Sequence, residues 1–112
     1  MKSITRDPLS SDLEKAPKVS VILTVKNEER TIGRAIESLL GIDYPDYEVI
    51  VVDGGSKDRT VTVAKNYRVR IIQTKDSTPG QGRNVGIVNS SYPVVALIDG
   101  DCYVKRLSLI HI

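Results

Sequence analysis

The sequence has little cysteine, no long apolar run and no excess of one charge. Its single cysteine, Cys102, cannot form a disulfide within the chain and weakly favours a reducing compartment. No apolar run approaches the roughly 20 residues of a membrane-spanning helix, and the first 17 residues lack the apolar core of a signal peptide. We therefore expect a cytoplasmic location.

The charged residues are balanced in sign. The 112 residues include 16 basic and 14 acidic side chains, for a net charge of +2. Such a balance does not favour binding to nucleic acid or to an acidic membrane surface, so we expect no nucleic-acid partner. With 40% hydrophobic and 27% charged residues, the composition is that of a small globular domain.

Apolar runs and helical stripes alternate along the chain. The runs predict strands at 18–25, 47–53, 69–74 and 94–98, and the stripes predict helices at 27–40, 58–67 and 83–89, with a loop at 75–82. This alternation is typical of an α/β fold, in which helices cover a parallel sheet and the crossovers are right-handed.

The predicted helix boundaries depend on capping residues. Asn27 is expected to cap the first helix, and Gly41 to end it. The segment 75–82 contains two glycines and a proline and is therefore predicted to be a loop. In the helix that follows, we expect Val85 and Val88 to point into the core.

Polar residues follow three of the four predicted strands, at 24–28, 53–56 and 99–101. Because parallel strands end at the same edge of a sheet, these groups are expected to meet there. The last group, Asp99-Gly100-Asp101, offers the oxygen ligands that Mg²⁺ or Mn²⁺ prefers. The alternative is a polar turn, since Asp-Gly is an ordinary turn dipeptide.

Four segments resemble, in the same order, the motifs of the family 2 glycosyltransferases. They are 19–29 (VSVILTVKNEE), 51–60 (VVDGGSKDRT), 82–86 (GRNVG) and 98–101 (IDGD), and the resemblance spans about 18–104. Members of this family have the GT-A fold, in which a Rossmann-like nucleotide-binding half precedes an acceptor-binding half. The resemblance therefore implies a three-layer α/β/α domain with a mainly parallel sheet, here a partial GT-A fold.

The resemblance also implies an activity, the transfer of a sugar from a nucleotide diphosphate sugar to an acceptor with the help of a divalent metal. The implied nucleotide-sugar-binding residues are Thr24, Val25, Asn27, Asp53, Gly55, Arg83 and Asp99. Within this set, Thr24 and Val25 would flank the base, and Asp53 would hydrogen-bond the uracil or its ribose. Arg83 would lie near the base and the diphosphate.

Asp99 and Asp101 would form the family's Asp-x-Asp metal motif, with Asp101 the more direct ligand of Mg²⁺ or Mn²⁺. A UDP-sugar is the favoured donor, and the acceptor is unknown. Two departures bear on the nucleotide. Many members carry two adjacent acids where this chain has Asp53-Gly54, and an aromatic or small residue where it has Lys26. Lys26 either reaches a phosphate or lies in solvent.

Several alternatives stay open. Asp53 could cap its own turn, and Arg83 could be a surface residue. The chain could also be a non-catalytic nucleotide-binding module. A dinucleotide-dependent oxidoreductase is disfavoured because no Gly-x-Gly-x-x-Gly follows the first strand. A phosphoacceptor domain built around Asp53 is disfavoured because the first strand ends without acids, at Thr24 and Val25.

We expect three parts in the chain: a polar arm at 1–17, a partial GT-A domain at 18–106 and a non-native tail at 107–112. The tail resembles the translation of a sequencing-library adapter, so His111 is interpreted as an artefact and not as a catalytic base. In inverting members the base lies downstream of the metal motif, so the catalytic residue is unknown and this fragment alone is expected to be inactive. Membrane association at the cytoplasmic face, through a missing C-terminal part, is left open.

Overall fold

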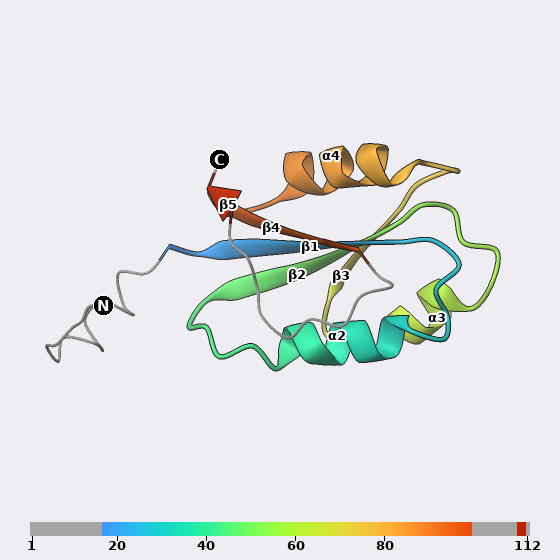
Figure 1. Cartoon of the computed structure of the whole chain (residues 1–112), viewed down its shortest axis with the longest axis horizontal. Helices are drawn as coiled ribbons and strands as arrows, with labels where there is room; N and C mark the ends of the chain where they lie inside the picture. The colour runs from blue at the N-terminus through green and yellow to red at the C-terminus, as the bar shows by residue number, and fades with distance from the viewer. Residues whose placement is uncertain (1–16, 100–109, 112) are drawn as a thin grey trace, which may run out of the picture.

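The computed structural model describes residues 17–99 and 110–111, and it places them around one central sheet (Figure 1). The strands lie in the order β3-β2-β1-β4-β5. Their bounds are β1 Val19–Val25, β2 Tyr47–Asp53, β3 Arg70–Gln73, β4 Val94–Asp99 and β5 Ile110–His111. The first four strands are mutually parallel, and β5 pairs antiparallel to β4.

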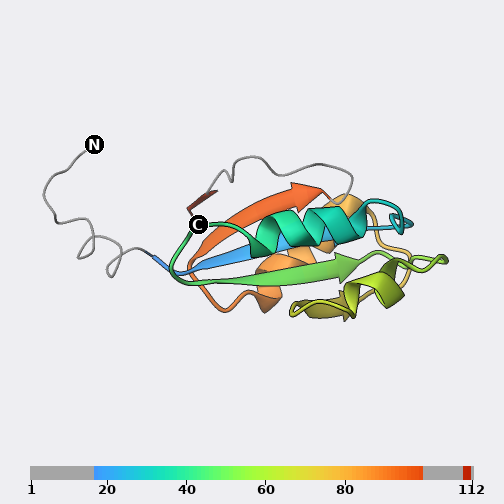
Figure 2. The same ribbon diagram turned by 90° about the horizontal axis from the view of Figure 1, so that it is seen from below.

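Helices cover both faces of this sheet. Their bounds are α2 Ile32–Leu40, α3 Thr60–Ala64 and α4 Pro79–Asn89. Figures 1 and 2 show α2 and α3 together on one face and α4 alone on the other. The predicted three-layer α/β/α architecture with a mainly parallel sheet is therefore confirmed.

Alternation along the strands divides the core into two layers. Val21 and Leu23 of β1 pack with the α2 side chains, whereas Ile22 belongs to the layer beneath α4. All three are fully buried, which explains why β1 is nearly apolar throughout. The predicted stripe of α2 is confirmed at Ile32, Ala35, Ile36 and Leu39, which are buried, but it is wrong at Leu40, which is 40% exposed.

Helix α4 packs on the sheet through two buried glycines. A Cβ atom at Gly86 would lie 2.4 Å from Cγ2 of Ile22, and one at Gly82 would lie 3.3 Å from Cγ2 of Thr24. Any larger residue at Gly86 would push the helix away from β1. These contacts therefore place the amino-terminal turn of α4 close to the carboxyl end of β1.

The prediction that Asn27 caps the first helix is wrong. Helix α2 begins five residues later, at Ile32, and Asn27 has a left-handed backbone with φ of 53°. Its N–H donates to Ser56 Oγ at 2.8 Å, and its Oδ1 accepts from Lys57 N at 2.8 Å. The side chain therefore joins two loops instead of capping a helix.

The predicted loop at 75–82 is wrong in its second half, because α4 begins at Pro79. Thr78 and Gln81 form a capping box: Gln81 N donates to Thr78 Oγ1 at 3.2 Å, and Thr78 N donates to Gln81 Oε1 at 2.9 Å. Pro79 fits the first helical position, where no N–H is needed. The inward placement of Val88 is also wrong, since it is 83% exposed.

Other boundaries shift by a few residues. Helix α3 and strand β3 are shorter than predicted, and Gly41 is confirmed as the C-cap of α2. In the described part of the chain, no helix combines the length and apolar character needed to cross a bilayer. Asp101 and Cys102 lie outside the described residues. The division into an arm, a domain and a non-native tail stays a prediction.

Candidate functional site

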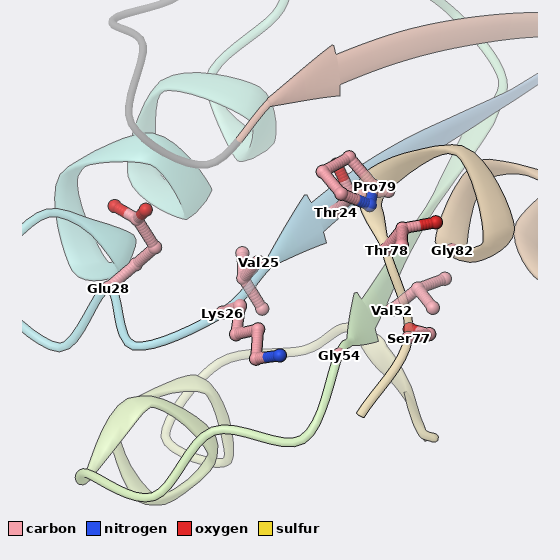
Figure 3. Close-up of a pocket in the computed structure, with 10 residues that line it drawn as sticks. All are labelled: Thr24, Val25, Lys26, Glu28, Val52, Gly54, Ser77, Thr78, Pro79 and Gly82. Atoms are coloured by element: carbon pink, nitrogen blue, oxygen red, sulfur yellow. The ribbon is translucent and has the colours of Figure 1, made fainter. Parts of the chain in front are cut away.

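A pocket of about 280 Å³ opens where β1 and β2 end, beside the start of α4 (Figure 3). Three segments line it. They contribute Thr24, Val25, Lys26 and Glu28 from the end of β1 onward, Val52 and Gly54 from the end of β2, and Ser77, Thr78, Pro79 and Gly82 around the start of α4. Ligands of open α/β sheets bind at this carboxyl edge.

The sheet register brings the predicted polar groups to this edge. Thr24, which lines the pocket, pairs with Val52 of β2 on one side and with Asp99 of β4 on the other. The next pair is Val25 with Asp53. The strand order places β1 between β2 and β4, and the direction of the chain across the sheet reverses between β1 and β4, so the pocket lies next to that point, on the β2 side of β1. The predicted residues Thr24 and Val25 therefore lie in the pocket wall, with the backbone of Asp99 alongside.

Asp53 is buried, at 2% exposure, and is not among the lining residues. Its Oδ2 accepts hydrogen bonds from Gly55 N at 3.1 Å and Ser56 N at 3.0 Å, and its Oδ1 accepts one from Ser56 Oγ. Gly55 has φ of +100°, and a Cβ there would lie 2.6 Å from Asp76 N. The geometry is that of a carboxylate capping its own turn, and a contact of Asp53 or Gly55 with a nucleotide stays a prediction.

Asn27 and Arg83 are also outside the lining set. Asn27 lies in the contact between the loops after β1 and β2. Arg83 is half-buried in α4 and follows Gly82, which does line the pocket. Their roles in nucleotide binding stay predictions.

The predicted metal motif is described only through the backbone of Asp99, since Asp101 is outside the described residues. Within residues 17–99 and 110–111, no cluster of three or more histidine, cysteine or acidic side chains is found. The metal motif therefore rests on the resemblance and on the register that sets Asp99 next to Thr24.

Sequence reasoning missed the α4 side of the pocket and left Lys26 undecided. Thr78 and Pro79 were assigned to a loop, although the spacing of Thr78 and Gln81 is a capping-box signal. Lys26 lines the pocket, and its Nζ lies 2.7 Å from Asp76 Oδ1. The hydrogen bond from Lys26 holds the pKa of Asp76 below its ordinary value.

Hydrogen bonds donated by backbone N–H groups join the loops that form the rim of the pocket. Gly54 N donates to Val25 O at 2.8 Å, and Ser77 N donates to Gly54 O at 3.0 Å, which joins the ends of three parallel segments. Glu28 N donates to Thr60 Oγ1 at 2.8 Å. Such bonds preorganise the pocket and reduce the entropy that ligand binding must remove.

A comparison with known families decides the assignment. The sequence model described as Glycosyl transferase family 2 matches residues 20–110, from the second residue of β1 past the end of β4. The chain belongs to this family.

Two relatives of the chain agree with that assignment. Glycosyltransferase AglE of Haloferax volcanii is 36% identical over 94 residues, covering 77% of this chain and 31% of AglE. Poly(ribitol-phosphate) β-N-acetylglucosaminyltransferase TarS of Staphylococcus aureus is 32% identical over 100 residues, covering 82% of this chain and 18% of TarS. This family 2 chain therefore spans less than a third of the length of either relative.

Solved structures show the same fold. The TarS fragment 1–349 in complex with UDP aligns with a TM-score of 0.72 at 33% identity, over 77% of this chain and 28% of that one. Glucosyl-3-phosphoglycerate synthase of Mycobacterium tuberculosis in complex with UDP aligns with a TM-score of 0.70 at 27% identity, over 91% and 40%. A Pyrobaculum calidifontis mannosyltransferase in complex with GDP-Man and Mn²⁺ has a TM-score of 0.75 at 23% identity, over 80% and 29%, and supports the fold alone. These neighbours confirm the Rossmann-like GT-A fold.

Proposed function

We propose that this chain is the donor-binding part of a glycosyltransferase that transfers a sugar from a nucleotide diphosphate sugar, with a UDP-sugar the favoured donor. The observation that carries this proposal is the register of Thr24, a pocket residue, directly beside Asp99. The proposed nucleotide pocket and the backbone of a residue of the expected metal motif thereby lie at one edge of the sheet. The presence of UDP in the TarS and glucosyl-3-phosphoglycerate synthase structures supports the choice of nucleotide.

The residues of the pocket suit a phosphorylated nucleoside. The amino-terminal turn of α4 carries a partial positive charge, and Thr78 and Pro79 of that turn face the pocket. Lys26, directly after β1, adds a hydrogen-bond donor to the pocket lining. Thr24 and Val25 form the wall against which a base can pack.

Asp99 and Asp101 fit a divalent cation by chemistry, because carboxylate oxygens are the ligands that Mg²⁺ and Mn²⁺ prefer. Asp99 stands at the edge of the sheet beside the pocket residue Thr24, where a cation could reach a diphosphate. When bound there, the cation would stabilise the negative charge of the departing nucleoside diphosphate as a Lewis acid.

The other residues of the proposed nucleotide-sugar set border the pocket. We assign Arg83 to the nucleotide because 82–86 (GRNVG) resembles the family motif and because the start of α4, the helix that carries Arg83, lines the pocket. Asn27, Asp53 and Gly55 are assigned to the adjoining turns. We place the base that activates the acceptor, and the site that binds the acceptor, outside the described residues. Any attachment to the cytoplasmic face of a membrane is placed there as well.

Calorimetric titration of the chain with UDP tests this proposal. We expect saturable binding at one site with Mn²⁺ present, and a loss of about tenfold or more in affinity when EDTA removes the metal. Asp99→Asn should cause a similar loss, whereas Asp43→Asn, the same change at an exposed acid before β2, should cause none. Absence of UDP binding, or equal binding with and without metal, would refute the proposal.

A second assay separates a transferase from the alternative, a non-catalytic nucleotide-binding module. The whole protein that contains this chain is mixed with a UDP-sugar and Mn²⁺, and release of UDP is followed in the presence of candidate acceptors. Release that depends on Asp99 indicates a transferase, and tight binding without release from the whole protein indicates a binding module.

A further inference from the structure

Lys26 and Asp76 form an ion pair at the edge of the pocket. Lys26 Nζ lies 2.7 Å from Asp76 Oδ1, with the lysine side chain 42% exposed and the aspartate side chain 91% exposed. Lys26 lines the pocket, whereas Asp76 does not. The ammonium group therefore stands between the pocket and an acidic side chain in solvent.

The position of Lys26 along the pocket is set by its neighbours. A Cβ atom built on Gly54 would lie 3.5 Å from Cδ of Lys26, and Figure 3 shows the Lys26 side chain extending toward Gly54. Gly54 follows β2 and Asp76 follows β3, whereas Asp99 ends β4 on the other side of β1. A nucleotide with its diphosphate near Asp99 would thus extend its nucleoside toward Lys26.

We propose that Lys26 is a specificity-determining residue that donates a hydrogen bond to an acceptor oxygen of the nucleoside, and that Asp76 competes with the ligand for the same ammonium group. This inference rests on the proposed function, because it assumes that the pocket binds a nucleotide. An ammonium group has donors and no acceptor, so it selects for carbonyl or hydroxyl oxygens of the ligand.

Replacing Asp76 by a ligand oxygen at the Lys26 ammonium group costs little free energy, because the ion pair is exposed to solvent. An ion pair with one partner as exposed as Asp76 is well screened by water and contributes little to stability. A ligand oxygen in the less solvated pocket forms a stronger bond with the same ammonium group, because a lower local dielectric strengthens charge-assisted bonds. Asp76 also places a negative charge next to an anionic ligand, which opposes binding.

The test compares Lys26→Met, Asp76→Asn and the double variant, titrated with UDP and with uridine in the presence of Mn²⁺. We expect Lys26→Met to weaken the binding of both ligands by the same factor, about tenfold. Asp76→Asn should strengthen the binding of uridine by about two- to fivefold. That gain should vanish in the Lys26→Met background, because the competition acts through the ammonium group.

A matched control pair lies at the opposite edge of the sheet. Lys18 Nζ is 3.5 Å from Asp46 Oδ2, with exposures of 58% and 49%, just before β1 and β2. Lys18→Met and Asp46→Asn change the net charge by the same amounts as the test variants. Both should leave the affinities for UDP and uridine unchanged, which separates a local contact from long-range electrostatics.

The outcomes distinguish the inference from the function on which it rests. Loss of UDP affinity without loss of uridine affinity in Lys26→Met would show a phosphate contact and overturn the inference, while the proposed function would stand. Unchanged binding in Lys26→Met, or an Asp76→Asn effect on uridine binding that persists without Lys26, would overturn it in the same way. If the unmodified chain binds neither ligand, both proposals fail.

Discussion

Thr24 and Asp99 are direct neighbours in the register of the parallel pair β1 and β4. Thr24 faces the pocket beneath the start of α4, where a Cβ on Gly82 would lie 3.3 Å from Thr24 Cγ2. The relationship connects two segments that are 75 positions apart in the sequence, one in the pocket wall and one in the expected metal motif. The geometry of the proposed donor site therefore depends on how closely β1, β4 and α4 are held together.

Close packing of α4 on β1 predicts that Gly86→Ala is destabilising. The new Cβ would lie 2.4 Å from Ile22 Cγ2, and Ile22 is fully buried and cannot move freely. We expect the free energy of unfolding to fall by about 1–3 kcal/mol, measured by urea denaturation. Gly80→Ala is the control in the same helix, because no atom lies within 4 Å of its Cβ position. It should be neutral or stabilising by up to about 1 kcal/mol, and equal effects of the two changes would contradict this account.

The capping box predicts that the hydroxyl of Thr78 stabilises α4. Thr78→Ala removes the acceptor for Gln81 N and should lower the free energy of unfolding by about 1 kcal/mol. Thr78→Ser keeps the hydroxyl and should cost much less. Thermal unfolding followed by circular dichroism measures both, and equal midpoints for the two variants would show that the hydroxyl does not cap the helix.

The amino edge of the sheet contains a carboxylate whose protonation should change stability. Glu48 accepts hydrogen bonds from Ser20 Oγ at 2.6 Å, Ser91 N at 2.8 Å and Arg70 Nη1 at 3.1 Å. Partial burial raises the pKa of Glu48, but these hydrogen bonds lower it by more, so the net pKa lies below its ordinary value of 4.5. Because the folded-state pKa is the lower one, the stabilisation is complete above pH 4.5 and is lost as the pH falls through the folded-state value.

Urea denaturation between pH 3 and pH 7 checks this expectation. Glu48→Gln should reduce the dependence of unfolding free energy on pH over the acidic part of this range. Asp43→Asn removes an exposed acid and should leave the dependence close to that of the unmodified chain. A steeper dependence in Glu48→Gln would contradict a lowered pKa of Glu48 in the folded state.

The turn after β2 predicts a structural cost for changes at Asp53. Its carboxylate accepts from Gly55 N, Ser56 N and Ser56 Oγ while being 2% exposed. Asp53→Ala leaves these donors without their acceptor and should lower the free energy of unfolding by about 1–3 kcal/mol. Asp53→Asn keeps one acceptor oxygen and should cost less. Equal stability of Asp53→Ala and the unmodified chain would show that the turn does not need the carboxylate.

The sheet could be predicted from the sequence because burial on both faces leaves a local signal. Strands β1, β2 and β4 are largely apolar runs, and their predicted bounds differ from the observed ones by at most one residue. The helical stripe of α2 was equally clear. At these positions the residue types alone predict a strand, because most side chains that contact either helical layer are apolar.

The first residues of the helices and the α4 side of the pocket could not be predicted from local sequence patterns. Asn27 is a good N-cap by type, yet its hydrogen bonds go to Ser56 and Lys57, about 30 positions away. Pro79, Gly80 and Gly82 predicted a loop, whereas all three belong to α4 and Gly82 gives close helix–sheet contact. Likewise, the pairing of Lys26 with Asp76 depends on tertiary structure that no local pattern contains.

The most direct test of the central claim is amide NMR of the ¹⁵N-labelled chain during titration with UDP and Mg²⁺. The account predicts saturable shift changes concentrated at the carboxyl edge, at Lys26, Gly54, Thr78, Gly82 and Asp99. Amides at the opposite edge, such as those beside Asp46, should not move. Changes centred on that opposite edge, or no saturable change at all, would contradict the assignment of this pocket as the donor site.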